Sequence, residues 1–289
     1  MIDAHHHLWR YDPLAHDWMT AAMGVLRRDF TMDDLAPLAR AAGVRGTVAV
    51  QARRTEDETR FLLAAAAAHP LILGVVGWAD AHGDRLEETV EAFARDPRLV
   101  GLREVLHDMP DVDYATSAAH RRLVAAAARA DLAYDLLLRP EHLVAATRLV
   151  DAFPGVRFVV DHIAKPPRDA TAGGPVDERR ALWSRGIRAL AERPNVACKL
   201  SGLLTEGDWG RWRADDVVPF LDLVLEAFGP RRCLVGSDWP VCTLAAGYGE
   251  AMGLVADYVA TWSEDERAAV LEGSARSWYR LADTGGSHP

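Results

Sequence analysis

The chain begins with three consecutive histidines after a short apolar stretch, in the run Ile2-Asp3-Ala4-His5-His6-His7. Alternate side chains of a β-strand point to the same face, so His5 and His7 would project together from a strand end, while His6 would face away. Such a pair can ligate a divalent metal ion or donate hydrogen bonds to a reacting carbonyl group. The competing interpretation is an expression-tag remnant, but the histidines continue into Leu8-Trp9-Arg10 without a linker. We therefore interpret the pair as part of a functional site.

Other ionisable residues follow later apolar runs. His162 follows Phe158-Val159-Val160, and Asp238 lies in Gly236-Ser237-Asp238-Trp239-Pro240. Taken singly, His162 could be a hydrogen-bonded core histidine and Asp238 a turn or helix-cap residue. At the same end of a sheet as the first two histidines, they would place three imidazoles around one carboxylate. This joint placement favours function over the structural interpretations.

Lysine is rare in this chain. Of the 33 basic residues only Lys165 and Lys199 are lysines. Arginine therefore supplies nearly all the cationic side chains of the chain. The two side chains are not interchangeable, because the ammonium is a compact point charge and the guanidinium a planar fork. We therefore expect lysine to be chemically required at both positions; chance is the alternative.

Eight strand-like apolar runs alternate with helical patterns along the chain. The expected strands cover residues 2–7, 46–51, 72–78, 99–106, 132–138, 156–162, 195–201 and 233–237. The expected helices cover 31–42, 56–68, 84–95, 118–130, 141–153, 177–193 and 215–228. Several helical stretches end at a proline just before the next strand, as at Phe153-Pro154-Gly155. This alternation predicts a parallel sheet covered by helices.

Eight such units in 289 residues match an α/β fold of the (β/α)8 type, the TIM barrel, better than an open doubly wound sheet. The glycine-rich dinucleotide-binding sequence that serves open sheets follows none of the expected strands. We expect a single domain over residues 1–282 and a frayed tail over 283–289. In such barrels the working residues come from the C-terminal ends of the strands, where the histidines and Asp238 would meet.

Composition argues against several classes of partner. The formal net charge is −9 and no basic run is present, which does not suit a nucleic-acid or anionic-membrane surface. No apolar stretch has transmembrane length and the N-terminus lacks signal-peptide features, so we expect a cytoplasmic protein. Cys198, Cys233 and Cys242 lack metal or redox spacing and are expected to be small buried residues. The sequence leaves open whether the barrel forms a homodimer.

Five motifs spread over nearly the whole chain carry a family resemblance. They are residues 2–13, Val160-Asp161-His162-Ile163-Ala164-Lys165-Pro166, Cys198-Lys199-Leu200-Ser201-Gly202, Gly236-Ser237-Asp238-Trp239-Pro240 and Gly273-Ser274-Ala275-Arg276-Ser277-Trp278-Tyr279-Arg280-Leu281. Together they resemble the lactonase branch of the amidohydrolase superfamily, and they occur in the same order. The resemblance implies a distorted amidohydrolase-type barrel that hydrolyses esters in carbohydrate catabolism. Sugar-acid lactone hydrolases of the L-fuconolactonase type are the nearest in kind, and pyrone-dicarboxylate lactonases are more distant.

Two departures limit what the resemblance implies. Glu104 stands after Arg103 where family members often have histidine, so the local charge differs and substrate choice should not be carried over closely. The fifth expected strand ends in Leu138-Arg139, without the histidine that binuclear sites of the superfamily use. The resemblance is therefore compatible with one divalent ion, zinc in the first place, or with catalysis without a metal. The residues that would hold a single ion are His5, His7, His162 and Asp238.

The activity implied by the resemblance is hydrolysis of a sugar-acid lactone, such as an L-fucono- or galactono-lactone. Asp238 would act as the base that activates water, and the three histidines would hold the ion or polarise the carbonyl. The residues expected to bind this small-molecule substrate are Arg103 and Lys165 at its carbonyl or carboxylate end, and Trp9, Trp78 and Trp239 as walls for the ring. Two alternatives remain: a metal-dependent, non-hydrolytic decarboxylase of the same superfamily, and an inactive barrel that binds a ligand.

Overall fold

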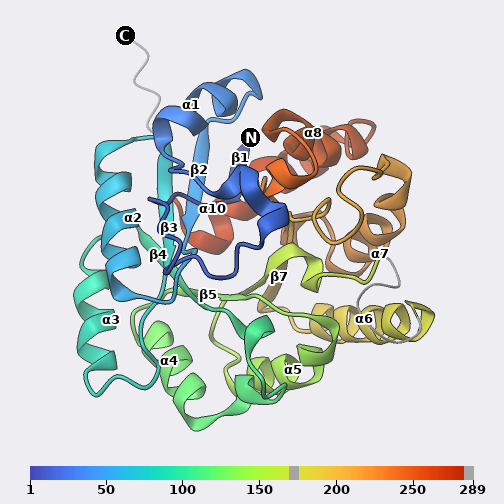
Figure 1. Ribbon diagram of the computed structural model, residues 1–289. Helices are drawn as coiled ribbons and strands as arrows, with labels where there is room; N and C mark the ends of the chain where they lie inside the picture. The colour runs from blue at the N-terminus through green and yellow to red at the C-terminus, as the bar shows by residue number, and fades with distance from the viewer. Residues whose placement is uncertain (169–175, 283–289) are drawn as a thin grey trace.

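Eight parallel strands form a ring in the order β1 to β8. The computed structural model describes residues 1–168 and 176–282 (Figure 1). The strands are β1 (Ile2–His6), β2 (Gly46–Val50), β3 (Ile72–Gly77), β4 (Leu99–Glu104), β5 (Ala133–Leu136), β6 (Phe158–Val160), β7 (Val196–Leu200) and β8 (Cys233–Val235). The ring closes just beyond the ends of β8 and β1, where the Asp238 amide donates to the His5 carbonyl at 2.8 Å and the His7 amide to the Trp239 carbonyl at 2.6 Å. The predicted (β/α)8 barrel is confirmed.

Helices α1 to α8 surround the ring of strands (Figure 1). The α-helices are α1 (Met32–Ala41), α2 (Glu56–Ala68), α3 (Leu86–Ala94), α4 (Ala118–Arg129), α5 (Leu143–Ala152), α6 (Val176–Ala191), α7 (Val218–Phe228), α8 (Tyr248–Tyr258), α9 (Glu264–Ala268) and α10 (Ser274–Tyr279). Short helical turns near the strand ends are η1 (Ala21–Leu26), η2 (Leu106–Asp108), η5 (Asp161–Ala164) and η9 (Val241–Leu244). Thr31, Thr55 and Ser117 cap the N-termini of α1, α2 and α4 through their side-chain oxygens. None of the helices in the described residues has the length and apolar content that spanning a bilayer requires.

Apolar side chains fill the inside of the ring as well as the layer between strands and helices. The inner cluster includes Ile2, Ala4, Val48, Val76, Ala133, Val159, Ala197 and Leu234 from the strands, and Ala275, Trp278 and Tyr279 from α10. Trp278 also bonds to Arg157 and Arg231, which precede β6 and β8. Helix α10 therefore closes the N-terminal end of the barrel, and the C-terminal end is left for polar residues. The three cysteines are free and buried, as expected.

Several strands are shorter than predicted, among them β4, which ends at Glu104, and β5, which spans only Ala133–Leu136. The sequence predicts a sixth strand over 156–162, but β6 ends at Val160 because residues 162–165 take left-handed φ angles of 47–56°. The eighth strand, predicted over 233–237, ends at Val235. The sequence analysis does not predict helices α8 to α10; α8 contains two glycines, which weaken a helical pattern. The predicted tail over 283–289 lies outside the described residues.

Tyr279 anchors α10 to the barrel interior, and its removal is a test of the fold. Its buried hydroxyl donates to the carboxylate of Asp135 at 2.8 Å. Tyr279→Phe leaves that buried carboxylate with one donor fewer, so we expect the free energy of unfolding, measured by urea denaturation, to fall by about 1–3 kcal/mol. Tyr258→Phe is the matched control, because its phenol donates to Asp222 at the surface, and it should change this free energy by at most about 0.5 kcal/mol. Equal losses in the two variants would contradict the anchor.

Candidate active site

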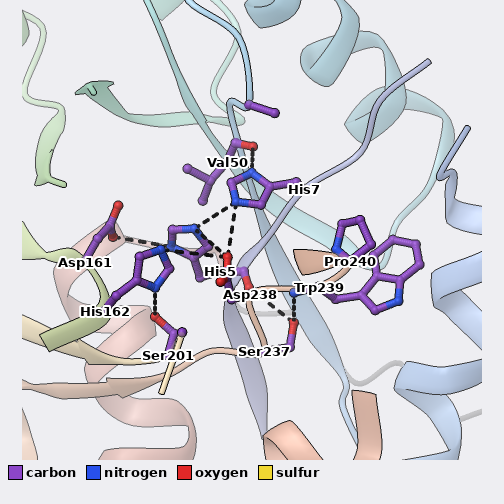
Figure 2. Close-up of polar contacts among 12 residues, drawn as sticks. His5, His7, Val50, Asp161, His162, Ser201, Ser237, Asp238, Trp239 and Pro240 are labelled. Atoms are coloured by element: carbon purple, nitrogen blue, oxygen red, sulfur yellow. Dashed lines mark hydrogen bonds and ion pairs between the residues drawn. The ribbon is translucent and has the colours of Figure 1, made fainter. Parts of the chain in front are cut away.

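Three histidines and an aspartate meet at the C-terminal ends of β1, β6 and β8 (Figure 2). The Nε2 atoms of His5, His7 and His162 lie 3.8, 3.4 and 3.8 Å from Oδ1 of Asp238. The Nε2 atoms of His5 and His7 lie 3.2 Å apart. None of the four residues is more than 6 % exposed. The structure thus brings together the four residues that the sequence analysis singles out for catalysis or metal binding.

A register shift in β1 aims His5 into this site. The pairing of β1 with β2 is irregular between Asp3 and His6. Ala4 belongs to the apolar cluster inside the barrel, yet the next residue, His5, also points inward. An irregularity of this kind can re-aim a side chain at a functional site. His6 lies apart from the cluster of imidazoles, with its Nε2 3.0 Å from Oγ1 of Thr47.

The carboxylate of Asp3 holds the turn that carries Asp238. It accepts hydrogen bonds from the Ser237 amide at 2.9 Å, the Ser237 hydroxyl at 2.6 Å and the Tyr248 hydroxyl at 3.1 Å. Burial raises the pKa of Asp3 to about 6, although these donors favour its charged form. Asp238 itself has a φ of +57°, which a non-glycine residue keeps only where its surroundings impose it.

Two glycines make room for the imidazoles. A Cβ on Gly236 would lie 2.8 Å from Cβ of His5, and a Cβ on Gly202 would lie 2.6 Å from Nδ1 of His162. Gly202 also has a φ of +59°, which glycine adopts at little cost. The glycines of two of the sequence motifs therefore serve the histidine cluster by their lack of a side chain.

His7 and His162 are oriented through their second ring nitrogens. Nδ1 of His7 lies 2.8 Å from the Val50 carbonyl, which can only accept a hydrogen bond. Nδ1 of His7 therefore carries the proton, and its Nε2 presents a lone pair to the site. Nδ1 of His162 lies 2.9 Å from the hydroxyl of Ser201, which fixes the ring between β6 and β7.

His5 contacts two groups that favour opposite protonation states of its Nδ1 atom. Its Nδ1 is 3.3 Å from Oδ1 of Asp161 and 3.2 Å from Nζ of Lys199. The carboxylate would accept a proton from Nδ1, whereas the ammonium would donate one to it. In the first case Nε2 offers a lone pair to the site, and in the second case it offers an N–H. Both tautomers of His5 therefore find a partner.

Burial keeps His5 and His162 neutral. It lowers the pKa of His5 well below its ordinary value and that of His162 to about 4. Burial alone would raise the pKa of Asp238, but the surrounding imidazoles, His162 foremost, lower it below its ordinary value. At neutral pH the site therefore combines the neutral imidazoles of His5 and His162 with an ionised carboxylate, which is the protonation state of metal ligands.

The donor set fits a single divalent metal ion. Among the described residues, one ligand atom each from His5, His7 and Asp238 lie within 4.8 Å of one another, and the same holds for His5, Asp161 and His162. Asp161 is already paired with two cations, so the first group is the one free to take an ion. Imidazole nitrogens with a carboxylate oxygen are ligands that suit zinc.

A layer of buried charges lies against the histidines. Nζ of Lys199 is 2.5 Å from Oδ2 of Asp135 and 2.9 Å from Oδ1 of Asp161. Arg103, which the sequence analysis assigns to substrate binding, donates to Asp161 at 2.8 Å and to the Gln51 carbonyl. Burial alone would raise the pKa of Asp161, but Lys199 and the neighbouring cationic groups hold it well below its ordinary value. Every carboxylate of this layer is therefore matched by a cation.

The site opens into a cavity of about 380 Å³. Besides the site residues, its lining includes Trp9, Trp18, Met23, Arg103, His107, Asp108, Arg139, Lys165, Glu206, Trp209, Val241 and Leu244. Three of the five expected substrate contacts, namely Trp9, Arg103 and Lys165, are thus on the cavity wall. Trp9 is held there by a hydrogen bond from its indole to the Arg28 carbonyl at 2.9 Å.

Trp78 and Trp239, also expected as walls, do not line this cavity. The indole of Trp78 donates to the carboxylate of Glu104 at 3.0 Å, which turns both side chains toward each other. Burial raises the pKa of Glu104, and this residue is not on the cavity wall either. Trp239 is 2 % exposed and packs edge-to-face on Phe30, with ring centroids 5.2 Å apart. Both indoles are therefore held by protein partners and do not line the cavity.

Glu206, Trp18 and Trp209 on the cavity wall are not predicted from the sequence. All three lie in long segments between a strand end and the next helix, where barrels carry their variable residues. Asp135 is not predicted either; its signal is a carboxylate inside the apolar run of the fifth strand. Loop length in the first case and a buried charge in the second could have pointed to them.

Known proteins are similar to this chain in sequence and in architecture. A family model described as Amidohydrolase matches residues 2–281. The chain belongs to the amidohydrolase family. This amidohydrolase is 40% identical over 297 residues to an L-fucono-1,5-lactonase of Burkholderia multivorans, covering 98% of this chain and 96% of that protein. It is 36% identical over 293 residues to an L-fucono-1,5-lactonase of Burkholderia ambifaria, covering 97% and 95%.

The barrel also matches a solved structure closely. A crystal structure of an amidohydrolase from Burkholderia multivorans with bound zinc superposes with a TM-score of 0.91 at 40% identity, covering 97% of this chain and 99% of that one. The family and the fold predicted from the motifs are thus confirmed, and a similar amidohydrolase binds the metal that suits this donor set.

Proposed function

We propose that this amidohydrolase hydrolyses the cyclic ester of a sugar acid, an L-fucono-lactone or a close analogue. The observation that carries the proposal is one ionised carboxylate, Asp238, within 3.8 Å of three imidazoles beside a cavity of about 380 Å³. Water attack on a lactone requires a proton acceptor and hydrogen-bond donors at the same point. Two relatives that match nearly the whole chain are named L-fucono-1,5-lactonase, which supports the same reaction.

Asp238 accepts the proton of the attacking water and returns it to the ring alkoxide that leaves. Its lowered pKa keeps it ionised throughout the neutral range but makes it a weak base toward free water. The water must therefore be acidified where it is held. A divalent ion, zinc by its ligands, held by His5, His7 and Asp238 would supply that acidity and polarise the carbonyl.

Arg103 stabilises the negative charge that develops on the carbonyl oxygen. Its guanidinium is only 3 % exposed yet lies on the cavity wall, with Nη1 3.4 Å from Nε2 of His5. The bonds to Asp161 and to the Gln51 carbonyl hold it in place before the substrate arrives. A charge fixed in advance in a buried site stabilises a transition state without reorganisation.

Replacement of the proposed base is the first test. Asp238→Asn keeps the shape of the side chain and removes its charge, so we expect kcat for hydrolysis of L-fucono-1,5-lactone, followed by proton release, to fall by about 100-fold or more. Asp57→Asn on exposed α2 is the control and should be silent. Activity retained within about tenfold, or ~1.4 kcal/mol of barrier, would contradict the assignment. Release of carbon dioxide from an aromatic carboxylic acid, with no hydrolysis of the lactone, would identify a decarboxylase instead.

The three consecutive histidines test the geometry of β1. We expect His5→Gln and His7→Gln to lower kcat by about 100-fold or more, and His6→Gln to leave it within about threefold, because His6 contacts Thr47 and not Asp238. Circular dichroism of each variant establishes that the barrel is folded. Equal losses from all three substitutions would show that the side chains do not lie as described.

Metal removal tests the proposed ion. We expect the purified protein to hold about one zinc ion per chain by elemental analysis, as the single donor set implies. Dialysis against a chelator should abolish lactone hydrolysis, and added zinc should restore it. Full activity in protein shown to contain no metal would leave the route in which the imidazoles polarise the carbonyl directly.

A further inference from the structure

An ion pair on the cavity wall has no part in the proposed hydrolysis. The ammonium of Lys165 donates to the carboxylate of Glu206, and both residues line the same cavity as Asp238. Lys165 follows β6 and Glu206 follows β7, so the pair joins two loops at the C-terminal end of the barrel. Their side chains keep 15% and 19% of their surface exposed. The pair can therefore meet a ligand.

The Lys165–Glu206 pair has hydrogen-bonding capacity left over. An ammonium has three donor hydrogens, and a carboxylate has about four acceptor positions. Over the described part of the chain, Nζ of Lys165 has this one partner and Oε2 of Glu206 accepts no hydrogen bond. A free donor and a free acceptor thus lie side by side. Neighbouring hydroxyl groups satisfy such an arrangement, because each hydroxyl both donates and accepts.

Two other ionisable groups of the cavity wall have a carboxylate partner, whereas Arg139 has no ion pair among the described residues. Arg103 is paired with Asp161 at 2.8 Å, and His107 lies 3.1 Å from Asp108. Hydrogen bonding to His107 lowers the pKa of Asp108, with a contribution from Arg139. Asp108 is thus an anion on the cavity wall, and a carboxylate on the ligand would be repelled by it.

Glu206 is a second anion facing the ligand. Burial alone would raise its pKa, but Lys165 and Arg139 hold the pKa below the ordinary value. A ligand carboxylate would have to displace Glu206 from Lys165 and leave one carboxylate partly buried without its cation, which is costly. An uncharged ligand avoids this cost. The Lys165–Glu206 pair therefore favours an uncharged ligand over a carboxylate at this place on the wall.

Other elements give the same cavity an apolar part. Met23 comes from η1, Val241 and Leu244 come from η9, and Trp18 precedes η1 with 36% of its surface exposed. A sugar lactone offers both kinds of surface, hydroxyl groups along its edges and C–H groups on its faces. Mixed linings of this kind bind such rings, because a few polar groups fix the orientation and apolar contacts supply area.

We propose that Lys165 and Glu206 bind neighbouring hydroxyl groups of an uncharged polyhydroxy lactone and so determine which lactones are hydrolysed. This inference rests on the proposed function and names its substrate class, lactones with free hydroxyl groups and no second carboxylate. A lactone without hydroxyl groups would displace water from Lys165 and Glu206 without replacing the hydrogen bonds that this water makes, so it binds poorly. Neither residue takes part in cleaving the ester, so the pair acts on KM more than on kcat.

Substrates with and without hydroxyl groups test the pair. The substrates are L-fucono-1,5-lactone, unsubstituted δ-valerolactone and the carboxylated 2-pyrone-4,6-dicarboxylate. We expect the wild type to prefer the first by kcat/KM over both others. Glu206→Gln and Lys165→Met should each lower kcat/KM for the hydroxylated lactone by about tenfold or more, mainly through KM, and leave δ-valerolactone within about twofold. Glu206→Gln should also reduce the ratio of kcat/KM for L-fucono-1,5-lactone to kcat/KM for 2-pyrone-4,6-dicarboxylate.

Asp208→Asn is the matched control, because Asp208 lies on the same loop as Glu206, is exposed and does not line this cavity. It should leave all three substrates unchanged. Equal losses for hydroxylated and unsubstituted lactones, or no loss in the Glu206 and Lys165 variants, would overturn the inference. A wild-type preference for the carboxylated lactone would overturn it as well.

Calorimetric titration with L-fucose separates this inference from the proposed function, because this sugar has ring hydroxyl groups but no ester. If the wild type hydrolyses none of the lactones, binding of L-fucose that weakens about tenfold in Glu206→Gln still supports the pair while the lactonase proposal fails. If the wild type hydrolyses the lactones and neither substitution in the pair changes kcat/KM, the lactonase proposal stands and the inference about the pair fails. If the wild type neither hydrolyses a lactone nor binds the sugar, both proposals fail.

Discussion

The interior of the barrel depends on the buried ammonium of Lys199. This group is fully buried and lies 2.5, 2.9 and 3.2 Å from Asp135, Asp161 and His5. An ammonium taken out of water is costly unless carboxylates match its charge and accept its hydrogens, as Asp135 and Asp161 do here. A planar guanidinium could not direct its donors in the same way to acceptors grouped around a single atom. At this position the geometry explains why a chain so rich in arginine has lysine.

The same charges connect the elements that carry the site. Lys199 on β7 pairs with Asp135 on β5 and with Asp161 just after β6, and Asp161 in turn pairs with Arg103 on β4. The chain of contacts runs from Tyr279 in α10 at one end to His5 at the other. The barrel thus has three layers: apolar side chains closed by α10, matched charges, and imidazoles around Asp238. Because the charge layer is buried and paired, it holds His5 and Arg103 in fixed positions beside Asp238. The geometry of the candidate site therefore follows from the pairing of the buried charges inside the barrel.

Much of this organisation is visible in the sequence, and what is not visible depends on three-dimensional contacts. The strands are continuous apolar runs because both faces of a parallel sheet are buried, so all eight are predicted to within a few residues. The alternation of β1 correctly separates His6 from His5 and His7, but the register shift that turns His5 beside Ala4 has no local signal. Trp78 and Trp239 stand at strand ends like true wall residues, and only the partners Glu104 and Phe30 show that they face elsewhere. Glu206 lies in a loop, and a loop has no hydrophobic periodicity from which the direction of its side chains could be predicted.

The division between strands and loops also bears on how binding and chemistry are joined in this enzyme. The reacting groups are almost fully buried near the strand ends, whereas Lys165, Glu206 and Trp18 lie on loops that are partly exposed. The two sets are not independent, because Lys165 ends the left-handed turn that begins at His162, and the Lys165 amide donates to the His162 carbonyl at 2.8 Å. This short turn therefore fixes the start of the Lys165 side chain relative to the imidazole of His162, which Ser201 orients. Because one rigid turn carries both residues, a ring bound at the Lys165–Glu206 pair would lie at a fixed place relative to Asp238, although the pair itself stays outside the cleavage step.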